Sequence, residues 1–190
     1  LLVITDGFQD ALRIGYQNRP DIFARHIQLP EMLYEQVIGV PERIDAQGEI
    51  LQSLTPDAES VLSGQLQKAY DEGIRACAIV LMHGYRYPVH EKRVAELAQQ
   101  VGFPQISVSH LVSPLMKLVS RGDTTVVDAY LSPILRRYVD RIAAALENSV
   151  GGIRQAEKTN PELRTQNSPS TPLHSPHPPR HQIKPSNRGH

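Results

Sequence analysis

Polar side chains that suit a small ligand gather in a loop near the amino end of the chain. The stretch 14–21 carries Asn18, Arg19 and Asp21, and a glycine before them and the proline between Arg19 and Asp21 constrain the backbone. An arginine fork, an amide and a carboxylate together match an anionic or amide-bearing ligand. We therefore predict that Asn18, Arg19 and Asp21 bind substrate. The alternative is an Arg–Asp pair that only closes a surface loop.

A second polar cluster follows the apolar run 74–82, which has the length of a buried strand. Its members are His83, Gly84, Tyr85, Arg86, Tyr87 and His90. Ligands of open α/β sheets collect beyond the carboxyl ends of strands, so we expect His83 to act as a general acid or base or to hydrogen-bond an amide substrate. We also expect His83 to face one cleft with the residues of the first loop. The alternative is a histidine satisfied by backbone groups at a strand end.

A third candidate is Arg121, which precedes Gly122 and Asp123 at the expected entrance of a helix. Free amides and the helix dipole attract anions at such a position, so we add Arg121 to the predicted substrate-binding residues. The alternative is a structural cap in which Asp123 itself occupies the helix end.

Two other kinds of chemistry are not expected. His83 and His90 have no further ligand at a metal-binding spacing, and we predict no metal site. Cys77 is the one cysteine of the chain and lies within the apolar run, so we predict an inert core thiol. A single cysteine forms no intrachain disulfide and fits a reducing compartment, which favours a cytoplasmic location.

Strands and helices alternate in the expected order of elements. Strands are predicted at 1–4, 74–82 and 105–109, and helices at 56–72 and from about 94 to 101. Thr55 as N-cap and Pro56 at the first helical position mark the start of the first of these helices. We therefore predict an α/β fold with a mixed, mostly parallel sheet and helices packed on it.

Two further elements complete the expectation. Residues 34–44 and 49–54 are predicted to pair as a β-hairpin around the turn 45–48. Residues 113–147 are expected to form the last structured element, a helix that is entered at 121–123. It has an apolar stripe and a kink or break at Pro133, where Ser132 would cap the restarted helix. The stripe consists of Val127, Leu131, Ile134, Leu135, Tyr138, Ile142 and Leu146.

The last forty residues differ in composition. The stretch 151–190 holds seven of the 15 prolines and no aromatic residue, and it carries a net charge of +4, which leaves −4 on the body. We predict domain 1–148 and a disordered tail, 149–190. The acidic body argues against nucleic acid as a partner, and the chain holds no apolar run long enough for a transmembrane helix. The chain lacks an initiating methionine and starts directly on strand residues, so we expect a fragment of a longer protein.

Three segments resemble one known family. The segment 15–21 reads GYQNRPD, 40–51 reads VPERIDAQGEIL, and 124–133 reads TTVVDAYLSP. In this order they resemble the corresponding segments of the ATP-dependent hydantoinase A / 5-oxoprolinase family, over residues 1 to about 147. Members of that family commonly have a stretch rich in Thr and Ser at the entrance to the helix that carries the third segment. This chain differs from that pattern, because it has Gly122 and Asp123 there.

The resemblance implies an activity for a longer parent protein. The family is similar to actin-like ATPases, and the sheet would be part of one lobe. Its members couple ATP hydrolysis to the opening of a cyclic amide such as 5-oxoproline or a hydantoin, and related members are carboxylase subunits. ATP and Mg²⁺ would then serve the parent, together with the remaining ATPase lobe or a partner subunit in a homo- or hetero-oligomer. No phosphate-binding glycine motif stands in this sequence, so we expect the isolated chain to bind no ATP and to be inactive. The competing interpretation is a non-catalytic assembly or regulatory module that kept the fold.

Overall fold

A computed structural model describes residues 1–16, 23, 25–26 and 31–159, with side chains up to residue 147. The chain divides into two compact units, Leu1–Arg141 and Ile142–His190. The loop residues 17–22, which include three predicted binding residues, lie outside the described residues. No helix in the described ranges is long and apolar enough to cross a membrane.

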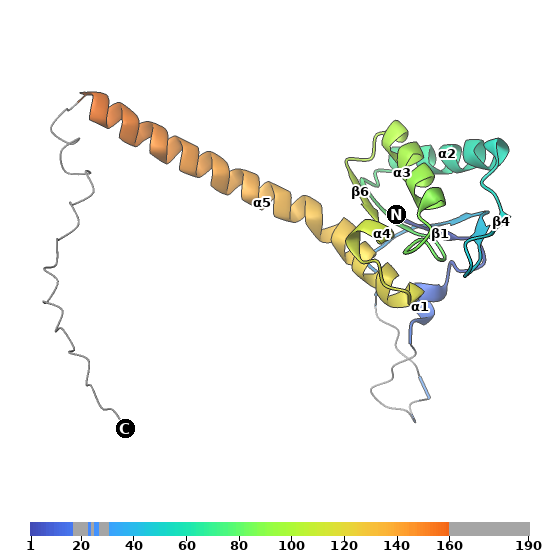
Figure 1. Cartoon of the computed structure of the whole chain (residues 1–190). Helices are drawn as coiled ribbons and strands as arrows, with labels where there is room; N and C mark the ends of the chain where they lie inside the picture. Colours follow the sequence, from blue (N-terminus) through green and yellow to red (C-terminus); the bar gives the residue numbers. More distant parts are fainter. Residues whose placement is uncertain (17–22, 24, 27–30, 160–190) are drawn as a thin grey trace, which may run out of the picture. The chain divides into compact units, whose positions relative to one another are not determined.

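A four-stranded parallel sheet forms the centre of the first unit, with strand order β2-β1-β5-β6 (Figure 1). Each pairing joins strands that are separated in sequence; for example, Leu2 lies opposite Val37 on one side and Ala78 on the other. The predicted parallel sheet is confirmed. Its strands are β1 (Leu2–Thr5), β2 (Val37–Val40), β5 (Ala76–Val80) and β6 (Gln105–Val108).

Helices cover both faces of this sheet, as the long apolar strands require. On one face α2 and α3 pack over Val3, Ile79 and Leu81, whereas the other face, with Leu2, Ile4 and Val80, is covered by α1 and the first turns of α5. Both central strands are accordingly buried along their length. The helices are α1 (Ala11–Ile14), α2 (Pro56–Asp71), α3 (Val89–Val101), α4 (Ser109–Val112) and α5 (Leu118–Thr159).

The start of α2 follows the sequence signals closely. Thr55 Oγ1 accepts a hydrogen bond from the backbone N–H of Ala58, and Pro56 occupies the first helical position. Asp57 and Glu59 add negative charge to the first turn, where the helix dipole favours it. The predicted cap is therefore confirmed.

The predicted hairpin is wrong in its first strand. Only β3 (Arg43–Ile44) pairs with β4 (Ile50–Gln52), and these two form a separate antiparallel sheet. The apolar stretch Val37–Val40 instead joins the main sheet beside β1. Val40 and Ile38 are buried there, which a two-stranded ribbon could not achieve, so burial decides the pairing.

The last helix also differs from the expectation in two respects. Helix α5 begins at Leu118, so Arg121 to Asp123 lie inside its first turns and Asp123 is not its cap. The prediction at Pro133 was a kink or a break. The helix continues through Pro133, and Ser132 Oγ donates to Asp128 Oδ1 instead of capping a new helix, so a break there is excluded. The helix ends at Thr159, beyond the boundary expected at 148, while 160–190 lie outside the described residues.

The apolar stripe expected on α5 is present, but it is not the side that packs on the sheet. The side chains of Thr125, Val126 and Ala129 are buried against the sheet. The residues of the predicted stripe are instead between 41% and 62% exposed. Helix α5 thus has two apolar sides, and only one of them is covered within the first unit.

Candidate functional site

The carboxyl ends of the parallel strands meet at one edge of the sheet, and polar residues follow each of them. Thr5 ends β1, the turn Met82–Tyr87 follows β5, and Ser109 follows β6. The hairpin β3–β4 follows β2 and comes to the same edge, since His83 and Tyr87 both bond to it. This edge is the candidate functional site, as expected for an open parallel α/β sheet.

His83 has a left-handed backbone conformation, with φ of 57°, directly after the central strand β5. Among the described residues it is the one non-glycine residue with positive φ. Such a conformation costs on the order of 1 kcal/mol or more, and it persists only where surrounding contacts fix it. The ring supplies one such contact, because His83 Nδ1 lies 2.7 Å from the carbonyl oxygen of Ile44.

The β3–β4 hairpin is held against the turn that carries His83. The hydroxyl of Tyr87 donates to the carbonyl of Gln47 at 2.9 Å, and its ring lies over Gly48. A Cβ at Gly48 would come within 2.6 Å of that ring. Asp45 Oδ1 accepts the backbone N–H groups of three following residues, which closes the hairpin turn. Hairpin and turn therefore form one rigid scaffold.

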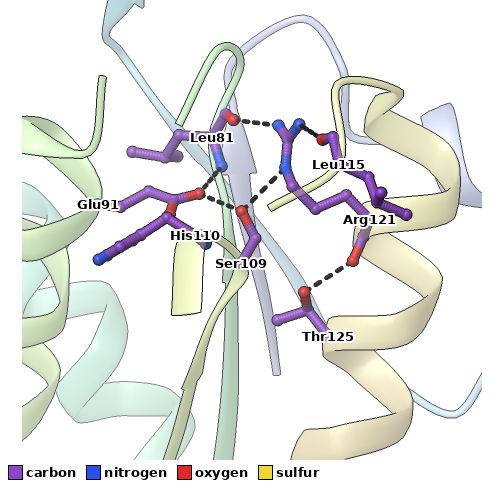
Figure 2. Close-up of polar contacts among 7 residues, drawn as sticks. All are labelled: Leu81, Glu91, Ser109, His110, Leu115, Arg121 and Thr125. Atoms are coloured by element: carbon purple, nitrogen blue, oxygen red, sulfur yellow. Dashed lines mark hydrogen bonds and ion pairs between the residues drawn. The ribbon is translucent and has the colours of Figure 1, made fainter. Parts of the chain in front are cut away.

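A buried carboxylate organises the adjoining part of the edge. Glu91, at the start of α3, is fully buried and accepts four hydrogen bonds. Oε1 bonds to the backbone N–H of Leu81 and to Ser109 Oγ (Figure 2). Oε2 bonds to the backbone N–H and Nδ1 of His110. Four donors satisfy the charge that burial would otherwise penalise. The backbone of Gly84 lies close to the Glu91 carboxylate, because a Cβ added to Gly84 would be 2.4 Å from Glu91 Oε1.

Arg121 brings a buried positive charge to the same network. Its Nε donates to Ser109 Oγ at 3.0 Å, and its two terminal nitrogens donate to the carbonyls of Leu81 and Leu115, each at 2.7 Å (Figure 2). Ser109 thus stands between the guanidinium and the Glu91 carboxylate. Burial lowers the pKa of Arg121, and the negative charge of Glu91 partly opposes this shift.

A second carboxylate–histidine pair lies nearby. His90 Nδ1 is 2.7 Å from Glu42 Oε2, and Thr5 Oγ1 donates to Glu42 Oε1 at 2.5 Å. Thr5 Oγ1 in turn accepts the backbone N–H of Met82, the residue before His83. Glu42 and Thr5 are buried, so this chain of bonds ties β1, the loop after β2 and the turn after β5 together. In the described part of the chain, no three histidine, cysteine or acidic side chains gather closely enough to hold a metal ion.

The structure places two of the five predicted binding residues. His83 and Arg121 both lie near Tyr85. The ring centroids of His83 and Tyr85 are 6.4 Å apart, and the guanidinium carbon of Arg121 is 5.4 Å from the centre of the Tyr85 ring. The guanidinium of Arg121 is fully buried and bonded to protein groups. Asn18, Arg19 and Asp21 lie outside the described residues, and the predicted cleft that they would share with His83 stays a prediction.

Sequence reasoning missed Glu91 as a member of the site. A signal was present, because Glu91 stands three and seven positions before Val94 and Ala98, on the buried side of α3. A charge at a buried helical position indicates a specific polar network. Glu42 lies within the segment 40–51 that carries the family resemblance, but nothing in its spacing indicated His90 as its partner.

These features define a parallel α/β module whose strand ends carry buried carboxylate–histidine pairs. Residues 1–102 match the family model described as the hydantoinase/oxoprolinase N-terminal region. The chain belongs to this hydantoinase/oxoprolinase family, and the suspected resemblance is confirmed.

Relatives in both sequence and structure support the same family. The chain is 37% identical over 168 residues to 5-oxoprolinase 1 of Arabidopsis thaliana, which covers 80% of this chain and 13% of that protein. It is 32% identical over 146 residues to the acetophenone carboxylase gamma subunit of Aromatoleum aromaticum, covering 68% of this chain and 20% of that subunit. The ATP-dependent caprolactamase from Pseudomonas jessenii has a similar structure, with a TM-score of 0.62 and 30% identity, over 77% of this chain and 21% of the caprolactamase chain. The chain thus spans between 13% and 21% of the length of these relatives.

Proposed function

We propose that this chain is part of an ATP-dependent enzyme that opens a cyclic amide, with 5-oxoproline ahead of hydantoins as the substrate. The observation that carries the proposal is the relationship to 5-oxoprolinases, at 37% identity for the relative from Arabidopsis thaliana. The structural similarity to a caprolactamase supports it, because caprolactam is also a cyclic amide. 5-Oxoproline hydrolysis to glutamate would connect the protein to glutathione metabolism in the cytoplasm.

In this proposal the carboxyl edge of the sheet contributes to the substrate site. Asn18, Arg19, Asp21 and His83 contact the cyclic amide, with the asparagine amide matching both the donor and the acceptor of the lactam. Arg121, also predicted from the sequence to bind substrate, has its guanidinium buried between Leu81, Leu115 and Ser109. It therefore supports the turn that holds His83, unless substrate binding releases it.

ATP and Mg²⁺ belong to the remainder of the longer protein in this proposal. The described residues do not fit a triphosphate by themselves, because their positive-φ glycines stand singly in separate turns and helix ends. These glycines are Gly7, Gly15, Gly48, Gly73 and Gly102. Phosphate capture needs successive backbone amides from a glycine-rich turn. We therefore assign the nucleotide to another lobe or to a partner subunit in a homo- or hetero-oligomer.

The direct test is an assay of the full-length protein with ATP and Mg²⁺. We expect ATP-dependent release of glutamate from 5-oxoproline, with hydantoins tested alongside. Absence of turnover of every lactam and hydantoin would exclude the proposed class. Omission of ATP is the matched control, since a hydrolase that does not couple the two reactions would act without it.

A second candidate function is that of a subunit of an ATP-dependent carboxylase. It is favoured by the 32% identity to the acetophenone carboxylase gamma subunit. Incorporation of labelled bicarbonate into a ketone substrate, without ring opening of 5-oxoproline, would select this function. If the full-length protein shows neither of these activities, the result favours a non-catalytic assembly or regulatory module.

A further inference from the structure

We propose that His83 Nε2 accepts the ring N–H of the cyclic amide and so selects lactams that carry this hydrogen. The inference rests on the proposed function for its substrate class. Its structural basis is a histidine whose tautomer, backbone and ring position are all fixed by neighbouring groups.

The tautomer follows from the partner of Nδ1. That partner is the carbonyl oxygen of Ile44, at 2.7 Å, and a carbonyl oxygen only accepts hydrogen bonds. Nδ1 must therefore carry the hydrogen and donate it. In the neutral ring Nε2 then has a bare lone pair, which makes it an acceptor for an N–H group.

The lone pair is also available. His83 Nε2 has no hydrogen-bond partner among the described residues. It is not fully buried either, because Gln105 Oε1 is the one side-chain polar atom in the described residues that is both fully buried and without a partner. In this inference His83 Nε2 meets a ligand at the carboxyl edge. The residue as a whole is half-buried, which limits competition by bulk water.

Neighbouring groups fix the direction of the lone pair. The hairpin that supplies the Ile44 carbonyl is held to the turn 83–87 by the bond from Tyr87 to Gln47. On the other side, the backbone of Leu81 bonds to both Glu91 and Arg121. An acceptor held in place before binding loses little entropy when the ligand arrives.

His90 and His110 differ from His83 in the partner of Nδ1. Each directs Nδ1 at a buried carboxylate, Glu42 or Glu91, that is already part of a bonded network. His83 is the one of these three whose ring bonds to a neutral backbone carbonyl. In the neutral ring, this pairing leaves Nε2 of His83 as a hydrogen-bond acceptor at the carboxyl edge.

A specificity follows from this hydrogen bond. 5-Oxoproline and hydantoin carry a ring N–H, whereas an N-methyl lactam does not. The methyl compound would leave the Nε2 acceptor unpaired and would place a methyl group where the hydrogen bond should form. A site built around a polar contact rejects such an analogue strongly, by about a hundredfold or more in kcat/KM.

The tautomer can be measured on the 190-residue chain with ¹⁵N-labelled histidine. Long-range proton–nitrogen correlation spectra of the neutral ring distinguish a protonated Nδ1 from a protonated Nε2. The variant His83→Gly identifies the His83 signals, since glycine tolerates the positive φ. We expect hydrogen on Nδ1 and none on Nε2; the reverse tautomer would overturn the inference.

The ligand contact is tested by adding 5-oxoproline and, separately, N-methyl-5-oxoproline to the same sample. We expect the Nε2 signal of His83 to move with 5-oxoproline alone, while the ring signals of His90 stay in place. Equal shifts with both compounds, or no shift with either, would overturn the inference.

In the full-length enzyme, His83→Gly should reduce the preference for the N–H lactam over its N-methyl analogue by at least about tenfold. The matched control Gly64→Ala, in an exposed part of α2, should leave the preference unchanged. An unchanged preference in His83→Gly would contradict the role of Nε2. Failure of the enzyme to open any cyclic amide would instead contradict the proposed function, and the tautomer measurement would still stand.

Discussion

Glu91 accepts hydrogen bonds from four donors that belong to two other segments of the chain, Leu81 and the pair Ser109-His110. We predict that Glu91→Gln lowers the free energy of unfolding by about 3 kcal/mol, because an amide group would face donors and the buried Arg121 would lose its balancing charge. Urea unfolding followed by circular dichroism measures the change.

The control for Glu91 is Glu96→Gln on the same helix. Glu96 pairs with Arg93 at the surface, where its side chain is 58% exposed, and its loss should change stability by no more than about 0.5 kcal/mol. Equal effects of the two substitutions would show that the buried network contributes nothing specific.

Cys77 provides a second prediction, which depends on pH. Complete burial raises the pKa of its thiol to about 12 from the ordinary value of 9.0. At about pH 8 only about one native molecule in ten thousand would carry the thiolate, so we expect negligible alkylation in native buffer and rapid alkylation in urea. Labelling of the native chain at the rate of a free cysteine would contradict the buried position.

The same shift affects stability in alkaline solution. The unfolded thiol ionises near its ordinary pKa of 9.0, whereas the native thiol stays protonated up to about 12. Rising pH in this window therefore favours the unfolded chain. Cys77→Ala should remove this contribution, which makes the loss of stability between these pH values less steep.

At the residue scale, the sequence indicated candidate functional residues better than it indicated the groups to which they hydrogen-bond. His83 and Arg121 were both found from their positions next to a strand and a helix. Their bonds to Ile44 and Leu81 join residues 39 and 40 positions apart, and no local spacing encodes such contacts. Burial of Arg121 was missed for the same reason, because its acceptors are mostly backbone carbonyls of other elements.

At the scale of elements, the apolar patterns predicted strands and helices well but not all of their neighbours. The run 74–82 was predicted as a buried central strand because it is apolar throughout, and its residues Ala76–Val80 form such a strand. The stretch Val37–Val40 was assigned to the hairpin because sequence proximity favours a hairpin, whereas burial beside β1 placed it in the main sheet. Helix α5 has two apolar sides, so periodicity alone did not show which one packs on the sheet.

Substitution of alanine for two glycines, one in the hairpin turn and one in α2, should change the free energy of unfolding in opposite directions. Gly48, with φ of 97°, lies beneath the Tyr87 ring, so Gly48→Ala should lower the free energy of unfolding by more than about 1 kcal/mol. Gly64 lies in α2 with no atom near a new Cβ, so Gly64→Ala should raise it by about 0.5–1 kcal/mol. Thermal unfolding of the two variants measures both effects, and a shift of the same sign in both would contradict the packing of the hairpin tip.

At the scale of the whole molecule, we predict that the isolated chain binds no ATP with useful affinity. The described glycines form no phosphate-binding turn, and the Arg121 guanidinium is committed to buried carbonyls. An exposed arginine alone adds little affinity in salt. Calorimetric titration with ATP and Mg²⁺ should show no saturable heat; micromolar binding would place the nucleotide site within this chain. The full-length protein is the positive control.

The order of strands in the sheet has a consequence for biosynthesis. The first strand, β1, lies between β2 and β5, and the hydrogen bond from Leu1 to Ala76 spans 75 positions. At a translation rate of about 5–20 residues per second, β1 would wait for about 4–15 seconds before the strand that completes its pairing has been made. During that interval β2 is the one neighbour of β1 in this sheet that has already been made. A chaperone that shields nascent apolar segments would therefore bind at β1, whose four residues are buried in the folded sheet.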